Sequence, residues 1–147
     1  MKTIRQMLKE KGNTVFTATT DMHVYDALAL MADKDIGALL VVKDEQLIGV
    51  FSERDYARKV ILKGKSSKDI YVGDIMSSPP IFIMPDNTNE QALALMSAKH
   101  IRHLPVMEND KLIGIVTIGD LVKSIIVEQK LVIDRLEKYI LANTSLT

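Results

Sequence analysis

The sequence contains an internal repeat, and this repeat limits what the chain can fold into more than any other feature. Residues 21–55 recur without a gap 65 positions later as residues 86–120. Fourteen of the 35 aligned positions are identical, including the run Ala-Leu-Ala-Leu-Met that starts at Ala27 and again at Ala92. A repeat of this length indicates one supersecondary unit that is built twice.

Each copy shows the same order of apolar patterns. Helical spacing alternates with short β-branched runs and polar turn segments. The first copy predicts a strand at 15–19, a helix at 24–34, a hairpin from strands 38–42 and 47–51, and a helix at 52–62. The second predicts a strand at 81–84, a helix at 89–99 and a hairpin from strands 104–107 and 112–116, with a polar turn at 108–111. Each half therefore reads strand, helix, strand, strand, helix, which is an α/β (α+β) pattern.

The repeat also predicts the domain organisation. We expect a first repeat at 1–64, a linker at 65–69, a second repeat at 70–126 and a helical extension and tail at 127–147. A unit of about 60 residues buries only about 60% of its unfolded surface, so the two sheets should pack against each other. The apolar stripe on the predicted helix at 121–141 could pack on its own domain or form a dimer contact.

Composition excludes several classes of protein. Lys plus Arg and Asp plus Glu both number 19, so no net charge favours a nucleic acid or a membrane surface. The chain has no cysteine, which removes disulfides and thiol chemistry. Neither a signal-peptide core nor an apolar run of about 20 residues is present, so we expect a soluble cytoplasmic protein.

Both copies end their hairpin with a hydroxyl residue followed three positions later by a carboxylate. Ser52 precedes Asp55 in this way, and Thr117 precedes Asp120. Such spacing at the start of a helix is typical of a capping box, in which both side chains bond the helix's own backbone.

The segments 49–55 and 114–120, with 101–106 before the second, resemble the cystathionine-beta-synthase (CBS) domain family. The resemblance covers Thr3 to about Ile126. It implies a pseudo-twofold pair of domains, called a Bateman module, with two clefts that take AMP, ADP, ATP, NAD or S-adenosylmethionine. It also implies a disc-shaped homodimer that regulates a partner protein and does not catalyse. Because no output domain is fused here, we expect the regulated protein to be a separate chain.

With this resemblance, the two carboxylates become candidate ribose ligands. A cis-diol offers two hydroxyl donors, and Asp120 and Asp55 could accept them. The helix N-termini, with the hydroxyls of Thr117 and Ser52, suit a nearby phosphate. The alternative is that all four residues serve only as helix caps.

The two clefts should differ in how they meet a phosphate. By resemblance, Arg102 and His103 would reach a phosphate, and Arg is the stronger candidate because its planar fork pairs with phosphate oxygens. Gly37 occupies the position of Arg102 in the first half, and Arg54 stands where the second half has Gly119. Arg54 could bind phosphate or obstruct the cleft, and Arg102 could instead be a solvated residue before a strand.

Adenine requires a flat apolar slot. The family pattern places five residues for this role, although each could equally belong to the core or to a helix start: Thr3, Ile36, Val50, Ile101 and Ile115.

Enzyme and metal functions lack sequence support. His100 and His103 lie three apart, but no further histidine or cysteine completes a metal set. The Gly-Lys-Ser at 64–66 lacks the first glycine and the preceding strand of a P-loop. The sequence therefore predicts an adenosine-sensing regulatory module, and the alternative is a ligand-independent dimeric adaptor.

Overall fold

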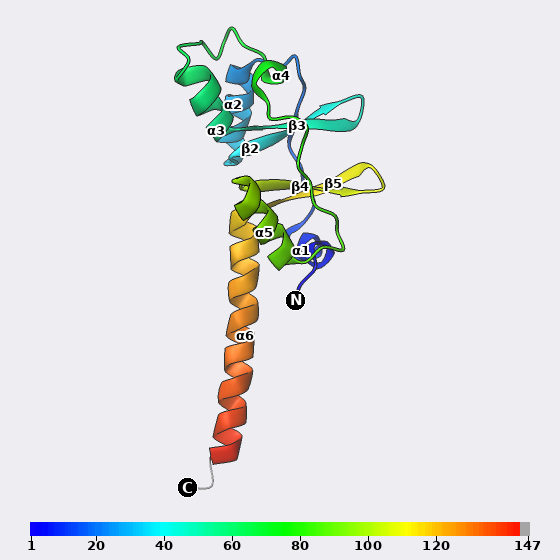
Figure 1. Ribbon diagram of the computed structural model, residues 1–147, viewed down its shortest axis with the longest axis vertical. Helices are drawn as coiled ribbons and strands as arrows, with labels where there is room; N and C mark the ends of the chain where they lie inside the picture. Colours follow the sequence, from blue (N-terminus) through cyan, green and yellow to red (C-terminus); the bar gives the residue numbers. More distant parts are fainter. Residues whose placement is uncertain (145–147) are drawn as a thin grey trace.

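The computed structural model describes residues 1–144, as two similar halves stacked on each other and one long helix that leaves the body (Figure 1). The first half contains β1 (Thr17–Ala18), α2 (Val24–Lys34), β2 (Ala38–Lys43), β3 (Gln46–Ser52), α3 (Glu53–Tyr56), the π-helical turn η1 (Ala57–Ile61) and α4 (Val72–Ile75). The second contains α5 (Asn89–Lys99), β4 (His103–Glu108), β5 (Lys111–Thr117) and α6 (Ile118–Thr144). The helix α1 (Ile4–Lys11) precedes both.

Each half is built on an antiparallel hairpin. In the first half β1 adds to β2 in parallel, which gives the strand order β1-β2-β3. The second half pairs β4 with β5. The two sheets meet where β3 contacts β5, so the predicted sheet-to-sheet packing is confirmed.

The repeat is reproduced in backbone detail. Both hairpins carry a register shift at the same place, after Val41 and after Val106. Both hairpin turns have two consecutive residues with positive φ, as two-residue turns between right-twisted strands require. These residues are Asp44 and Glu45 in the first turn and Asn109 and Asp110 in the second.

The strand predicted at 81–84 is reduced to a single bridge. Ile83 pairs in parallel with Val106, donating to the carbonyl of Pro105 at 3.0 Å and accepting from Met107 at 2.9 Å. Proline has no N–H, and three prolines, at positions 79, 80 and 85, surround this segment. They leave too few donors for a longer ladder.

The two cores exchange their N-terminal helices. Ile4, Met7 and Leu8 of α1 are buried in the second core, with Met96 and Leu104. The linker helix α4 takes the equivalent place in the first core, where Val72 and Ile75 pack with Phe51 and Val60. Each core therefore takes a helix from the other sequence repeat, and the domain boundaries given above stay a prediction.

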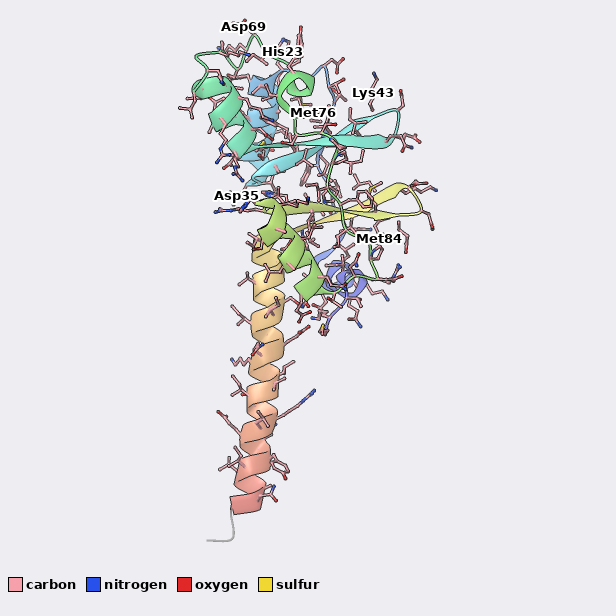
Figure 2. The ribbon with its side chains drawn as sticks, viewed as in Figure 1. His23, Asp35, Lys43, Asp69, Met76 and Met84 are labelled. Carbon is pink, nitrogen blue, oxygen red and sulfur yellow. The ribbon has the colours of Figure 1, made fainter. Side chains whose placement is uncertain are left out.

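Two glycines allow these helices to approach the sheets. A Cβ on Gly114 would lie 2.8 Å from the side chain of Leu8 in α1. A Cβ on Gly49 would lie 2.7 Å from Met76 and 2.9 Å from the carbonyl oxygen of Ser77, just after α4 (Figure 2). The repeated Leu-Ile-Gly is therefore needed for a close approach of two segments.

The helix α6 starts inside the second half and ends far from it. Leu121 is fully buried, but every described side chain from Gln129 to Asn143 is exposed (Figure 2). The stripe at 121–141 thus packs on its own domain only in its first turns. No helix among the described residues is long and apolar enough to cross a membrane.

Candidate functional site

The strand-to-helix junction of the second half presents Asp120 at the first turn of α6. Thr117 donates its backbone N–H to Asp120 Oδ2 at 2.9 Å, and its hydroxyl accepts from the Asp120 N–H at 3.2 Å. These are the two bonds of the predicted capping box. Gly119 lies exposed above them, and a Cβ there would come no nearer than 3.7 Å to Thr117 Oγ1. The junction is open to solvent on this side.

A lysine from the other end of the sequence also reaches this carboxylate. Lys11, the last residue of α1, lies with its Nζ 2.6 Å from Asp120 Oδ2 and donates to the carbonyl oxygen of Ile115 at 2.7 Å. Within residues 1–144, both the lysine and the cap use Oδ2, and Oδ1 has no hydrogen bond. One oxygen of Asp120 therefore remains as an acceptor.

These contacts set the charge of Asp120. Partial burial would raise the pKa of its carboxyl group, but the hydrogen bonds from Lys11 and from the Thr117 backbone outweigh this effect. The pKa of Asp120 therefore lies below its ordinary value. The residue is a carboxylate at neutral pH.

His103, the first residue of β4, lies close enough to this carboxylate to feel its charge, and Arg102 precedes it in the sequence. Burial lowers the pKa of His103, and the positive charges of Lys11 and Arg102 lower it further, against the opposite effect of Asp120. The imidazole is therefore neutral at pH 7. A Cβ on Gly37 would lie 3.4 Å from the His103 ring, so the first half covers this side of the site. Arg102 is exposed, and its carbonyl accepts from the N–H of Ile118 at 2.9 Å.

The equivalent junction of the first half is closed. Asp55 is 7% exposed. Ser52 donates to its Oδ2 through the backbone N–H at 3.0 Å and the hydroxyl at 3.1 Å. Its Oδ1 accepts from the Ser77 hydroxyl at 2.9 Å and lies 3.1 Å from Lys59 Nζ. Both oxygens are engaged, which favours the cap alternative for Asp55 and Ser52.

Arg54 links the two halves. Its guanidinium donates to the carbonyl oxygen of His100, the residue that ends α5. The side chain is therefore held by protein, and its predicted phosphate role would require it to leave this bond.

The predicted adenine-contact residues are spread over both halves. Ile36 packs on the first core and Ile101 on the second, and both are half-buried. Val50 exchanges two backbone hydrogen bonds with Ser77, at 3.0 and 2.9 Å. Thr3 caps α1 by accepting from the N–H of Gln6 at 3.2 Å, one helix length away from Lys11. Ile115 alone among the five directly contacts the Lys11 and Asp120 pair, through its carbonyl.

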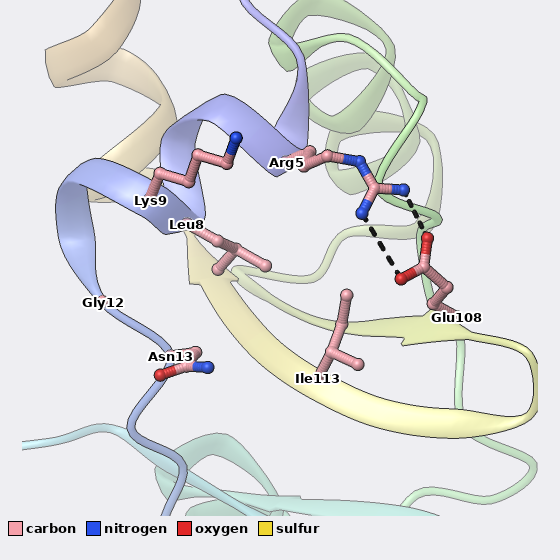
Figure 3. Close-up of a pocket in the computed structure, with 7 residues that line it drawn as sticks. All are labelled: Arg5, Leu8, Lys9, Gly12, Asn13, Glu108 and Ile113. Carbon is pink, nitrogen blue, oxygen red and sulfur yellow. Dashed lines mark hydrogen bonds and ion pairs between the residues drawn. The ribbon is translucent and has the colours of Figure 1, made fainter.

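A surface hollow lies apart from both junctions. It has a volume of about 460 Å³ and lies between α1 and the β4–β5 hairpin (Figure 3). Arg5 closes one end by donating to both carboxylate oxygens of Glu108, one of them at 3.3 Å. Neither Asp120 nor Asp55 lines it.

Three residues that the sequence did not suggest belong to the junctions: Lys11, Lys59 and Ser77. Lys59 lies four positions after Asp55 on one helix, so helical spacing could have found it. Lys11 and Ser77 reach the junctions only through the packing of α1 and α4. Among the described residues, no group of three or more His, Asp or Glu side chains is placed to hold a metal ion.

The fold and the two junctions define a class of protein: a duplicated α/β module with related carboxylates at the points where each half turns from sheet to helix. The family model for the CBS domain matches residues 11–62 and 72–127, so the chain belongs to the CBS-domain family. The resemblance seen in the sequence is confirmed.

Relatives and solved structures agree. The chain is 40% identical, over 94% of its length and 71% of the other's, to the mitochondrial CBS domain-containing protein CBSX3 of Arabidopsis thaliana. A CBS-domain protein from Burkholderia ambifaria MC40-6 has a similar structure, with a TM-score of 0.83 and 46% identity over 87% of this chain and 96% of that one. The CBS domain pair of protein MJ0100, solved with 5′-methylthioadenosine and S-adenosyl-L-methionine, shares the fold with a TM-score of 0.76 and 20% identity, over 87% of this chain and 98% of that one.

Proposed function

We propose that this chain is a regulatory module that binds an adenosine compound at the Asp120 junction and signals its occupancy to a partner protein. The observation that carries the proposal is the carboxylate of Asp120, which is ionised, half-buried and has Oδ1 unoccupied within the described residues. The complex of MJ0100 with two adenosine compounds supports the ligand class.

The surroundings of Asp120 suit a ribose phosphate. The two ribose hydroxyls would donate to the carboxylate, as in dinucleotide folds. Lys11 places a positive charge on the carboxylate, and Arg102 adds a second beside the neighbouring His103. The N-terminus of α6 adds the positive end of a helix dipole. Lys11 would exchange its bond to Asp120 for one to the phosphate.

This charge distribution selects among the adenosine compounds. AMP, ADP, ATP and NAD carry phosphate and would gain from Lys11 and Arg102. S-adenosylmethionine has no phosphate, and its sulfonium and ammonium leave it with a net positive charge, so it would gain less from both. We therefore propose AMP, ADP, ATP or NAD as the ligand, with the second junction as the primary site.

Occupancy would be transmitted through the contacts between the halves. Gly37 of the first half packs beside His103, and Arg54 holds the carbonyl of His100. A ligand that prefers one angle between the halves would shift the population of that angle. The module would act as a homodimer in the cytoplasm, with a regulatory and not a catalytic role.

A thermal melt with each compound tests this proposal. At 100 times its dissociation constant, a ligand adds about 2.7 kcal/mol of stability. For a chain of this length, that corresponds to a rise of about 5–10 °C. We expect the rise with a phosphate-bearing compound and its loss in Asp120→Asn.

The matched control is Asp55→Asn. Because Asp55 is buried and bonded on both oxygens, this variant should melt at a lower temperature but keep the ligand-induced rise. If no adenosine compound changes the melting temperature of the native chain, the sensor proposal is wrong. The cap contacts at both junctions would then favour the ligand-independent adaptor.

A further inference from the structure

We propose that α6 pairs with the α6 of a second copy of this chain, and that the two helices run antiparallel. The proposal rests on the proposed homodimer and names the surface that forms it. It does not depend on a ligand.

The helix α6 carries a regular seam that is apolar except at Gln129. Ile125 in this seam is half-buried, and the other members are exposed. Alternate steps of three and four residues connect its members, which is the spacing of paired helices. They are Val122, Ile125, Gln129, Val132, Leu136 and Tyr139. Ile126 and Ile133 widen the seam along one side, and each has more than half of its side chain exposed.

One side of the exposed part of α6 lies near the rest of the chain, where Val132 and Arg135 line an open hollow with Lys2 and Glu10. Every described side chain from Gln129 to Asn143 is exposed, and the helix extends away from the body there (Figure 1). An isolated helix of about 15 residues is only marginally stable in water. A large exposed apolar face is also typical of an interaction site. A partner along the seam would stabilise the helix and cover its apolar face.

Charges beside the seam indicate that the partner is a second copy of α6 and that it runs antiparallel. Glu128 and Arg135 lie seven residues apart on the side opposite Ile126 and Ile133. In an antiparallel pair, Ile125 faces Leu136 of the second copy and Val122 faces its Tyr139. The same register brings Glu128 next to Arg135 of the second copy, and by symmetry the ion pair forms twice.

Glu128 has the oxygen that this ion pair needs. Its Oε1 accepts from the backbone N–H of Lys2 at 2.9 Å and from Asn89 Nδ2 at 3.3 Å. Both bonds use Oε1, and they hold that oxygen against Lys2 and Asn89 of the same chain. Oε2 can then face an arginine.

A parallel pair fits the sequence less well. It would place Glu128 against Ile133 of the second copy, so a charge would face an apolar side chain and gain no partner. The α6 sequence thus complements itself in the antiparallel direction.

Disulfide formation tests the register, because the native chain contains no cysteine. We would prepare Ile125→Cys and Leu136→Cys separately and oxidise each alone and then both together. In the antiparallel pair the mixture forms a covalent heterodimer. Each variant alone does not, because like positions lie about 16 Å apart along the axis, beyond the Cα separation of about 7 Å that a disulfide spans.

The control pair is Lys123→Cys with Lys138→Cys. These positions lie at the same level along the helix but on the face away from the seam, and their mixture should not cross-link. Cross-linking of Leu136→Cys with itself would mean a parallel pair and overturn the proposal. A dimer in sedimentation that forms no cross-link in any mixture would also overturn it, while the proposed homodimer would stand.

Charge reversal gives an independent measurement. Arg135→Glu places two carboxylates together at both ends of the pair. It should raise the dissociation constant of the dimer about tenfold. Lys138→Glu makes the same change of charge off the seam and should leave it unchanged. Equal effects of the two variants would contradict the ion pair.

Discussion

At the scale of single residues, the two related aspartates have the same place in the repeat but different surroundings in the structure. Asp55 and Asp120 align in the repeat and both cap a helix. Asp55 is also bonded by Ser77 and lies beside Lys59, whereas Asp120 meets the ammonium of Lys11 and keeps Oδ1 unbonded within residues 1–144. Replacing the Lys11 contact by a ligand costs less free energy than breaking the hydrogen bonds of a buried carboxylate. The two junctions therefore differ in accessibility.

Lys11 gives a prediction at this scale. Lys11→Met removes the ammonium that would bond the phosphate, and a charge-assisted bond contributes about 1.5–3 kcal/mol. We expect AMP binding to weaken about tenfold or more, while adenosine binding is unchanged or improves because Asp120 is released. Calorimetric titration of both compounds measures this.

The control for that variant is Lys9→Met, also on α1 but directed at the surface hollow (Figure 3). It should alter neither affinity. Equal losses for AMP and adenosine in Lys11→Met would show that the lysine does not meet the phosphate.

At the scale of elements, each hairpin is shaped by the helix that crosses it. The Leu-Ile-Gly runs look alike in the sequence, but Gly114 meets the side chain of Leu8, and Gly49 meets the backbone of Ser77. A side chain can change its rotamer, whereas a backbone that is itself hydrogen-bonded to Val50 cannot move freely.

The two glycines should therefore respond differently to alanine. Gly49→Ala should destabilise the fold by about 1–3 kcal/mol. Gly114→Ala should cost less, because Leu8 can move away. Urea denaturation of both variants measures the difference, and a larger loss for Gly114→Ala would be inconsistent with the packing described here.

At the scale of the whole molecule, the exchange of N-terminal helices joins the two halves into one folding unit. Ile4, near the start of the chain, is fully buried in the second core, about 100 residues from Leu104 in the sequence. The second half therefore cannot complete its core without the first residues of the chain.

This arrangement predicts that a residue next to the N-terminus is essential for stability. Ile4→Ala should cost about 2–5 kcal/mol, as for other buried large-to-small changes. Leu62→Ala, at a side chain that is 76% exposed, should have no effect. A denaturant midpoint for Ile4→Ala equal to that of the native chain would contradict the assignment of α1 to the second core.

The sequence by itself determined the repeat, both hairpins, the helices at 24–34 and 89–99 and both caps, because these depend on spacing within about 35 residues. It also predicted the family and placed Asp120, Thr117 and Gly119 at one junction. It wrongly predicted a strand at 81–84. All the ligand contacts, at this junction as well as at Thr3, Ile36, Val50 and Ile101, stay predictions.

Only the tertiary structure decided which junction is open. Lys11 reaches Asp120 because α1 packs on the second core, and Ser77 reaches Asp55 because α4 packs on the first core. It also decided that α6 leaves the body, since a stripe of apolar residues has the same spacing whether it faces its own core or solvent. Contacts between distant segments depend on the packing of whole helices, so they cannot be predicted from local sequence patterns.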